Sequence, residues 1–217
     1  MNFERPPVYF DIETGPLPRS EVEQFMPEFG KPKNYKDEAK IAEVLAKKEA
    51  EWFEKSALAA TTGKVLAVGY CTNENDVVIL EGDESTILVS FWNAVTYHGA
   101  FLQKLIGFNS NEFDIPFMVR RSWKLGVKVP DTLFKLARGR VYLNESCIDI
   151  LDYWSFGTRD SIKLKNLAKF LNVGDKNGSG ADFAKTYETD KSSALSYLKN
   201  DVLLTLRCAK AMQLIKN

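Results

Sequence analysis

The sequence predicts an α/β fold with a mixed sheet of about five strands flanked by helices, formed by a single domain over residues 1–217. One pattern and the composition of the chain support this prediction. Short runs of β-branched and aromatic residues alternate along the chain with longer stretches in which apolar residues recur at helical spacing. A chain of 217 residues with 45% hydrophobic content can also bury one sizeable core. The order of the strands does not follow from these patterns.

The first predicted strand, residues 8–14, carries two acids near its end. Apolar and polar residues alternate along it, so Asp11 and Glu13 share one face of the strand. Two neighbouring carboxylates repel each other unless one binds a proton or both share a cation. Hard divalent ions such as Mg²⁺ prefer oxygen ligands of this kind. The alternative is an exposed strand end at which both acids are solvated.

A helical insertion is predicted at about residues 19–60, after the first strand. Residues 19–33 are interrupted by proline and glycine, which favours a surface loop. Residues 34–60 show helical spacing, with a predicted inward stripe formed by Ile41, Val44, Leu45, Lys48 and Trp52.

The middle of the chain returns to short elements. Residues 64–71 and 77–80 are predicted to form a β-hairpin, and residues 85–95 a helix. The segment through Phe101 and Leu102 is predicted to be helical or loop, and it leads to a short buried strand at 105–109.

A second group of polar residues follows that buried strand. It spans residues 109–117, and a helix is expected to begin near Phe117. Strand ends of open α/β sheets bind ligands, and a helix N-terminus offers unpaired backbone N–H groups. The alternatives are ordinary structural roles, with Asn109 as a turn residue and Asp114 as a helix cap.

The last third of the chain contains a predicted strand at 146–151, a helix at 161–171, a flexible loop at 174–182 and an amphipathic helix at 192–212. Tyr197 and Asp201 lie four residues apart on that last helix, so they share one side of it. The alternative is a surface tyrosine beside an exposed acid.

In order, these groups read Asp-x-Glu on the first strand, Asn-x-x-x-Phe-Asp opening a helix, and Tyr-x-x-x-Asp on the last helix. This pattern resembles the DEDD superfamily of 3′–5′ exonucleases, which has a ribonuclease-H-like fold, and specifically its tyrosine (DEDDy) branch. Tyr197 stands where that branch has its tyrosine, while Ser196 stands where the sister branch has a histidine. The chain is similar, over residues 10–209, to stand-alone relatives of the proofreading domain of family-B DNA polymerases.

The resemblance implies metal-dependent removal of nucleotides from the 3′ end of single-stranded DNA, with two divalent ions, Mg²⁺ or Mn²⁺, as cofactors. On this interpretation Asp11 bridges the two ions, and Glu13 and Asp201 bind the ion on the nucleophile side. Asp114 supports the other ion, and Tyr197 orients or deprotonates the attacking water. A phenol with an ordinary pKa near 10 is a poor base, so the metal would do most of the activation.

The resemblance also implies substrate contacts. Thr14 would touch the terminal nucleotide, while Asn109 and Phe113 would position the sugar or stack near it. The loop at 174–182 would be either a lid over the site or a plain connector.

Basic residues gather in one further segment. Residues 119–141 contain seven lysines and arginines against Asp131 alone, which predicts a phosphate-contacting surface around Arg120 and Arg121. A solvated helix face is the alternative. The whole chain has 29 basic and 29 acidic residues. Acids that bind cations are neutralised, so the balanced total charge does not exclude a polyanionic substrate.

Other features narrow the classes of function. No apolar run reaches membrane-spanning length and the N-terminus is not a signal peptide, so a cytoplasmic protein without a membrane partner is expected. Cys71, Cys147 and Cys208 fit no metal-ligand pattern and are expected to be buried, reduced thiols. The only histidine, His98, matches no motif and is expected to be structural or exposed, which disfavours hydrolases built on a histidine base.

Two alternatives to a DNA exonuclease stay open at this point. One is an RNA-trimming exoribonuclease of the same superfamily, and the other is a non-catalytic nucleic-acid-binding or polymerase-accessory module. The presence of all four carboxylates together with Tyr197 favours an enzyme. A DNA polymerase or another replication or repair protein is the expected partner, acting in trans.

Overall fold

The computed structural model describes residues 5–32, 34–35, 37–97, 101–136, 146–175 and 180–215. It consists of two compact units, one formed by residues 14–64 and the other by residues 1–13 together with 65–217. His98 and part of the loop at 174–182 lie outside the described residues. Within the described part of the chain, no helix is both long and apolar enough to cross a membrane.

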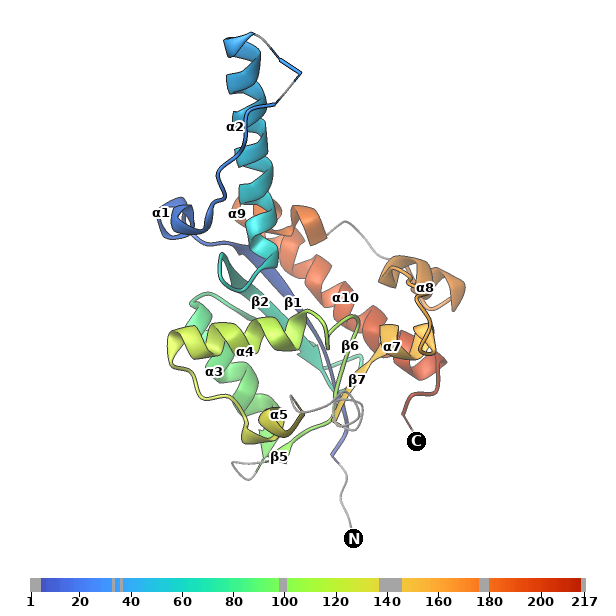
Figure 1. Ribbon diagram of the computed structural model, residues 1–217. Coiled ribbons are helices and arrows are strands. Elements are labelled where there is room, and N and C mark those ends of the chain that lie inside the picture. Colours follow the sequence, from blue (N-terminus) through green and yellow to red (C-terminus); the bar gives the residue numbers. More distant parts are fainter. Residues whose placement is uncertain are drawn as a thin grey trace. The chain divides into compact units, whose positions relative to one another are not determined.

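The larger unit is built on a five-stranded sheet in the order β3-β2-β1-β6-β7 (Figure 1). Strand β1 (Val8–Pro16) pairs in parallel with β6 (Leu105–Gly107), which pairs in parallel with β7 (Cys147–Asp149). Strand β2 (Gly63–Cys71) pairs antiparallel with β3 (Val78–Glu81). The predicted mixed sheet and the predicted hairpin are therefore confirmed.

Helices complete the larger unit. They are α3 (Glu84–Val95), α4 (Asp114–Leu125), α5 (Asp131–Leu136), α7 (Ile150–Ser155), α8 (Leu164–Phe170), α9 (Phe183–Thr189) and α10 (Lys191–Ala211), with a short 3-10 turn η3 (Gly180–Asp182) before α9. One element differs from expectation, since the segment predicted to be helical or loop forms a small antiparallel pair, β4 (Thr96–Tyr97) and β5 (Phe101–Leu102). Pairing of Thr96 with Leu102 and of Tyr97 with Phe101 defines these strands.

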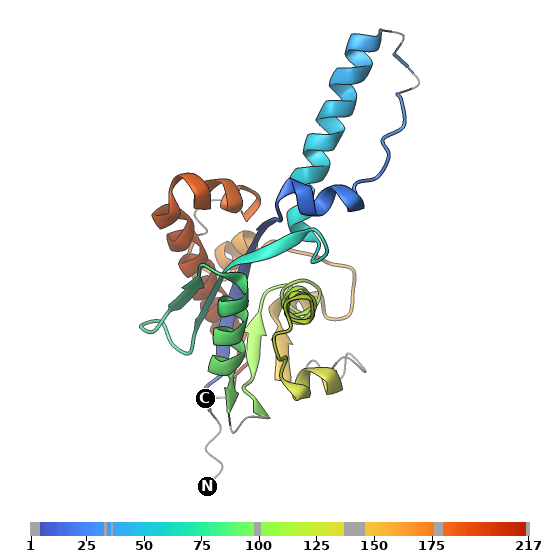
Figure 2. The same cartoon turned by 90° about the vertical axis from the view of Figure 1, so that its left-hand side faces the viewer.

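Alternation along β1 sends its side chains to two different cores. Phe10 packs against Phe91 of α3, with ring centroids 5.6 Å apart. Tyr9, on the opposite face, belongs to the cluster of buried residues that contains most of the inner side of α10. Both helices can be followed in Figure 1 and, after rotation, in Figure 2. The residues that share a face with Tyr9 therefore point toward α10.

The smaller unit contains α1 (Arg19–Val22), η1 (Glu23–Phe25), α2 (Glu38–Lys55) and η2 (Ser56–Leu58). Two short helical turns thus lie where a surface loop was predicted. Asp37 caps α2 by accepting a hydrogen bond from the Ala39 N–H at 2.9 Å.

The predicted inward stripe of α2 needs correction, because this helix has no buried residue among those described. Its apolar side chains are at most half-buried. A single domain with an insertion at about 19–60 stays a prediction.

The buried thiols agree with expectation. Cys71, Cys147 and Cys208 are each free and buried, and burial raises the pKa of each thiol to about 12. At neutral pH they are protonated apolar side chains.

Candidate metal centre

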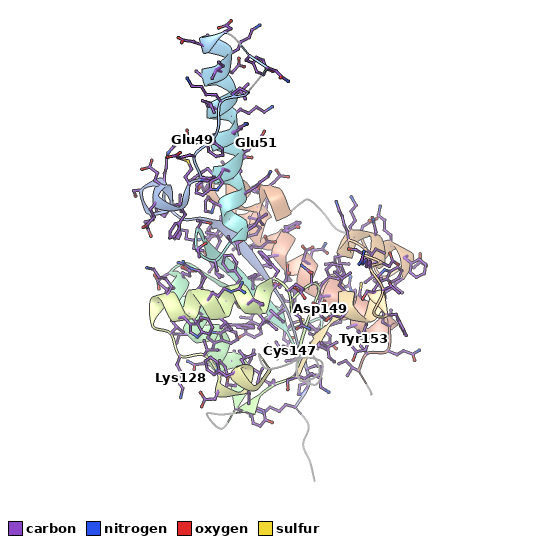
Figure 3. All side chains as sticks on the ribbon, in the orientation of Figure 1. Glu49, Glu51, Lys128, Cys147, Asp149 and Tyr153 are labelled. Atoms are coloured by element: carbon purple, nitrogen blue, oxygen red, sulfur yellow. The ribbon has the colours of Figure 1, made fainter. Side chains whose placement is uncertain are left out.

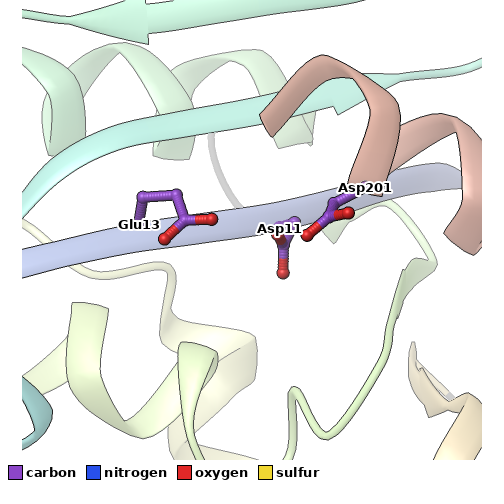
Figure 4. Close-up of side chains that lie close together, drawn as sticks. All are labelled: Asp11, Glu13 and Asp201. Atoms are coloured by element: carbon purple, nitrogen blue, oxygen red, sulfur yellow. The ribbon is translucent and has the colours of Figure 1, made fainter. Parts of the chain in front are cut away.

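Three carboxylates meet between β1 and α10. One oxygen each of Asp11, Glu13 and Asp201 lies within 4.8 Å of the others, and this is the group of metal-ligating type found among the described residues (Figure 4). Glu13 and Asp201 are buried, while Asp11 is half-buried. Three anions in such a space repel strongly unless positive charge joins them. Oxygen-only donors suit hard divalent cations, so the residues fit Mg²⁺ or Mn²⁺.

The sequence brings these acids together through two periodicities. Asp11 and Glu13 share the face of β1 that Tyr9 directs toward α10. Asp201 lies one helical turn after Tyr197 on the side of α10 that packs on the sheet. The predicted grouping of the first and third motifs is therefore present in the structure.

A glycine in β2 allows α10 to pack this closely. A Cβ atom at Gly69 would lie 2.8 Å from Cγ2 of Val202 and 3.0 Å from Cγ of Leu198. Both residues flank Asp201 on the inner side of α10. A side chain at position 69 would therefore require the Val202 and Leu198 side chains, or the helix that carries them, to shift.

Asp114 lies beside the cluster without belonging to the group of three. It is the first residue of α4, it is buried, and its Oδ1 accepts a hydrogen bond from the Ile12 N–H at 3.1 Å. That N–H lies in β1 between Asp11 and Glu13, so the second motif is tied to the backbone of the first. Burial, followed by the charge of Asp149, raises the pKa of the Asp114 carboxyl to about 7.

The Asp114 pKa predicts a pH dependence of stability in metal-free protein. Because its folded-state pKa is raised, its contribution is fully present below the ordinary pKa of 3.8 and is lost as pH rises toward about 7. The free energy of unfolding in EDTA should fall by up to about 1.4 kcal/mol per pH unit in this window relative to Asp114→Asn. Urea titrations of both proteins across the window measure the difference, and parallel stability curves would contradict the prediction.

Tyr197 is buried at the same place. Burial, followed by the charges of Asp201 and Glu13, raises the pKa of its hydroxyl. A Cβ atom at Gly180 in η3 would lie 3.5 Å from this hydroxyl and 3.9 Å from Oε2 of Glu13. Residue 180 therefore borders the site, and a side chain there would be in ordinary van der Waals contact with the tyrosine and the glutamate.

The turn that precedes Asp114 is held by an acid that none of the three motifs contains. Asp149 accepts hydrogen bonds from the backbone N–H groups of Asn109 (2.7 Å), Asn111 (2.9 Å) and Leu151 (2.9 Å). Figure 3 labels Asp149 where β7 meets α7. Asn109 has a left-handed backbone with φ of 59°, so the turn is tight. In the sequence Asp149 is an acid inside the strand predicted at 146–151, and a single acid at such a position is too common to indicate this role by itself.

Removing Asp149 should therefore destabilise the turn that leads into the site. Asp149→Ala leaves three backbone N–H groups without their acceptor, and we expect a loss of about 3 kcal/mol in the free energy of unfolding. The matched control is Asp152→Ala, because Asp152 is exposed and accepts only a 3.3 Å hydrogen bond from the Asn111 side chain in this region. Equal, small losses for both variants in urea unfolding would show that Asp149 does not hold the turn.

The predicted substrate residues differ in how exposed their side chains are. Thr14, Asn109 and Phe113 are half-buried, and the Phe113 ring packs on Phe117 with centroids 5.5 Å apart. Arg120 is exposed.

The structure corrects the prediction that Arg121 contacts substrate phosphates. Its side chain is buried, and it donates to Glu84 through Nε at 2.9 Å and through Nη2 at 2.7 Å. On α4, adjacent residues point in different directions, so Arg121 faces α3 whereas Arg120 faces solvent. Arg121 is therefore not part of a phosphate-contacting surface.

Comparison of the sequence with known proteins gives a match to a family model and matches to individual proteins. Residues 56–216 match the model of a family described as "predicted 3′-5′ exonuclease related to the exonuclease domain of PolB". An uncharacterized protein of Methanocaldococcus jannaschii is 30% identical over 130 residues, which cover 58% of this chain and 69% of that protein. A DNA polymerase of Archaeoglobus fulgidus is 24% identical over 159 residues, which cover 68% of this chain and 20% of the polymerase.

A solved structure agrees in fold. The family B DNA polymerase from Pyrobaculum calidifontis matches 95% of this chain with a TM-score of 0.59 and 17% sequence identity, over 24% of its own chain. This likeness confirms the predicted ribonuclease-H-like α/β fold. The chain thus spans about a quarter or less of the polymerases that it matches.

Proposed function

The chain belongs to the family of predicted 3′-5′ exonucleases related to the exonuclease domain of PolB, and from this membership we propose that it is an active nuclease. Its reaction would be metal-dependent hydrolysis of phosphodiester bonds from the 3′ end of single-stranded DNA. The observation that carries the proposal is the group of three carboxylate oxygens within 4.8 Å of one another, with Asp114 bonded to the same strand.

We further propose that the site is of the tyrosine type. Asp11, Glu13 and Asp201 would hold the cations, supported by Asp114. Two bound Mg²⁺ or Mn²⁺ ions would supply activation of the attacking water and stabilisation of the leaving 3′ oxygen. Because its pKa is raised, Tyr197 keeps its proton and can orient the attacking water as a hydrogen-bond donor or acceptor. Asn109, Phe113 and Thr14 would position the terminal nucleotide.

The test uses 5′-labelled single strands of DNA and RNA with the same sequence. Each is incubated with Mg²⁺ or Mn²⁺, with EDTA, and with the Asp11→Ala variant. A ladder that shortens from the 3′ end, on DNA and absent with EDTA or the variant, is the expected result. Preferential shortening of RNA would favour the exoribonuclease. Intact substrate under every condition, with binding retained, would favour a non-catalytic nucleic-acid-binding or polymerase-accessory module.

A DNA polymerase or another replication or repair protein is the proposed partner in trans. The support is the likeness of this chain to parts of two archaeal DNA polymerases. Faster removal of a mismatched 3′ terminus in the presence of a polymerase would support this partnership, and an unchanged rate would count against it.

A further inference from the structure

Two large aromatic side chains lie exposed at the end of α4 and in α5. Trp123 is 59% exposed and Phe134 is 45% exposed. Their rings stack on each other with an interplanar angle of 3° and centroids 6.4 Å apart. The stacking orders the pair, while a large part of each ring remains in contact with water. Such a rigid, exposed apolar surface favours a binding role over a packing role.

Trp123 lies on the exposed side of α4. The outward residues follow helical spacing, and each is exposed or half-buried: Phe113, Pro116 and Arg120 lie three or four residues apart, and Trp123 and Lys124 lie three and four residues beyond Arg120. The opposite side of α4 is buried, with Phe117, Met118 and Arg121 facing inward. The outward ridge begins at Phe113, the residue before Asp114, whereas the Asp114 side chain itself faces inward.

The length of the helix sets the distance from the chemistry. Trp123 is nine residues beyond Asp114, which corresponds to about 14 Å along the helix axis. Figure 1 shows α4 lying in front of α3, with the chain then turning back below α4 to α5. A single strand with its terminal nucleotide at the metal centre could reach the pair within a few nucleotides.

The charges around the pair favour a polyanion. Among the side chains described in residues 114–136, the exposed cations are Arg120, Lys124 and Lys128, and the exposed acid is Asp131 (Lys128 is labelled in Figure 3). The ion pair of Arg121 with Glu84 faces inward and does not neutralise this surface. Exposed aromatic rings flanked by cations are the usual means of binding single-stranded nucleic acid without sequence preference.

We propose that these residues form a platform for the single strand on the 5′ side of the nucleotide being removed. The "α4–α5 platform" consists of Arg120, Trp123, Lys124, Lys128 and Phe134. Bases stack on Trp123 or Phe134, and the three cations contact backbone phosphates. The proposal rests on the proposed function, because the metal centre fixes where the 3′ end lies.

The first test compares substrate lengths. For Trp123→Ala, the ratio of kcat/KM on a long single strand to kcat/KM on a dinucleotide should fall by about tenfold or more. A dinucleotide is too short to reach the platform, so it reports the metal centre by itself. The matched control is Phe170→Ala, because Phe170 is 66% exposed on α8 and outside the platform. An unchanged ratio in Trp123→Ala, with an active enzyme, would overturn the platform.

The second test measures binding without catalysis. In an Asp11→Ala background, fluorescence anisotropy with a 5′-labelled single strand gives the salt dependence of the dissociation constant. Charge reversal of Arg120 and Lys124 should reduce the slope of log K against log salt by about 0.7 for each lost phosphate contact. Charge reversal of Lys165, which is exposed on α8, should leave this slope unchanged. A slope that is unchanged by reversal of the platform cations would also overturn the proposal.

These tests separate the two proposals. An inactive wild-type protein whose single-strand binding depends on Trp123 would overturn the proposed function and support the platform. An active enzyme whose substrate-length ratio and single-strand binding do not depend on Trp123 would support the proposed function and overturn the platform. Loss of self-association in Trp123→Ala, without loss of nucleic-acid binding, would show that the pair is a contact between copies of this chain and would overturn the platform.

Discussion

Asp11→Asn is expected to reduce nucleotide release by about a thousandfold or more, and at the same time to stabilise the protein in EDTA. The loss in rate corresponds to about 4 kcal/mol of transition-state stabilisation, which is what removal of a carboxylate proposed to hold the catalytic ions should cost. The gain in stability follows because the asparagine removes one of three carboxylates that crowd within 4.8 Å. One substitution thus moves activity and stability in opposite directions.

The measurement pairs a nuclease assay with thermal unfolding, each with EDTA and with Mg²⁺ or Mn²⁺. Metal should raise the unfolding temperature of the wild type, because an ion that binds only the folded state stabilises it by mass action, and should raise that of Asp11→Asn much less. Asp160→Asn is the control, since Asp160 is an exposed acid outside the cluster. A variant that is less stable than the wild type in EDTA would contradict the account of repulsion.

Tyr197→Phe provides the internal comparison for this prediction. Its hydroxyl is proposed to orient the attacking water, so its removal should slow the reaction by no more than about a hundredfold. Because the pKa of the hydroxyl is raised, the phenolate is not available as a base at neutral pH. Equal losses for Tyr197→Phe and Asp11→Asn would mean that the tyrosine has a larger role than orientation.

The parts of the site that could be predicted are those that depend on local periodicity. Alternation in a strand places Asp11 beside Glu13, and a helical turn places Tyr197 beside Asp201, so both pairs follow from spacing. The strands of the sheet could be predicted for the same reason, because they are short runs with a clear pattern, whereas their order in the sheet did not follow from these patterns. Assembly of the two pairs into one group required the resemblance, since no local rule brings β1 to α10.

The parts that could not be predicted depend on contacts between distant elements. Asp149 is an ordinary acid in the sequence, and its role appears only when β7 lies next to β6 and its carboxylate meets the turn at Asn109. Gly69 is likewise one small residue in an apolar strand until α10 packs on it. Arg121 belonged to a basic run whose members looked equivalent, and only the packing of α3 on α4 distinguishes it from Arg120.

The buried ion pair between Arg121 and Glu84 predicts a second large effect, on the stability of the protein. Glu84→Ala leaves the buried Arg121 guanidinium without its carboxylate and removes the acceptor of the Val65 N–H, which lies 2.8 Å from Oε1 of Glu84. Breaking a buried ion pair from one side costs about 3–5 kcal/mol. We expect a loss of that size in the free energy of unfolding, or a fall of about 10 °C in the unfolding temperature. The salt bridge joins α3 to α4, so the metal centre at the start of α4 should also be weakened.

Arg120→Glu and Arg121→Glu form the matched pair that separates stability from binding. Arg120 is exposed, so its reversal should change the free energy of unfolding by no more than about 0.5 kcal/mol while weakening the binding of a single strand. Reversal of Arg121 places a second carboxylate against Glu84 in a buried site, and that variant should unfold at a much lower temperature. Arg121→Met in a Glu84→Leu background removes both charges and should recover the stability lost to the unpaired charge, while the Val65 N–H still lacks its acceptor. If Arg121→Glu instead kept its stability and lost binding, the ion pair would be secondary, and Arg121 would return to the substrate surface that the basic run first indicated.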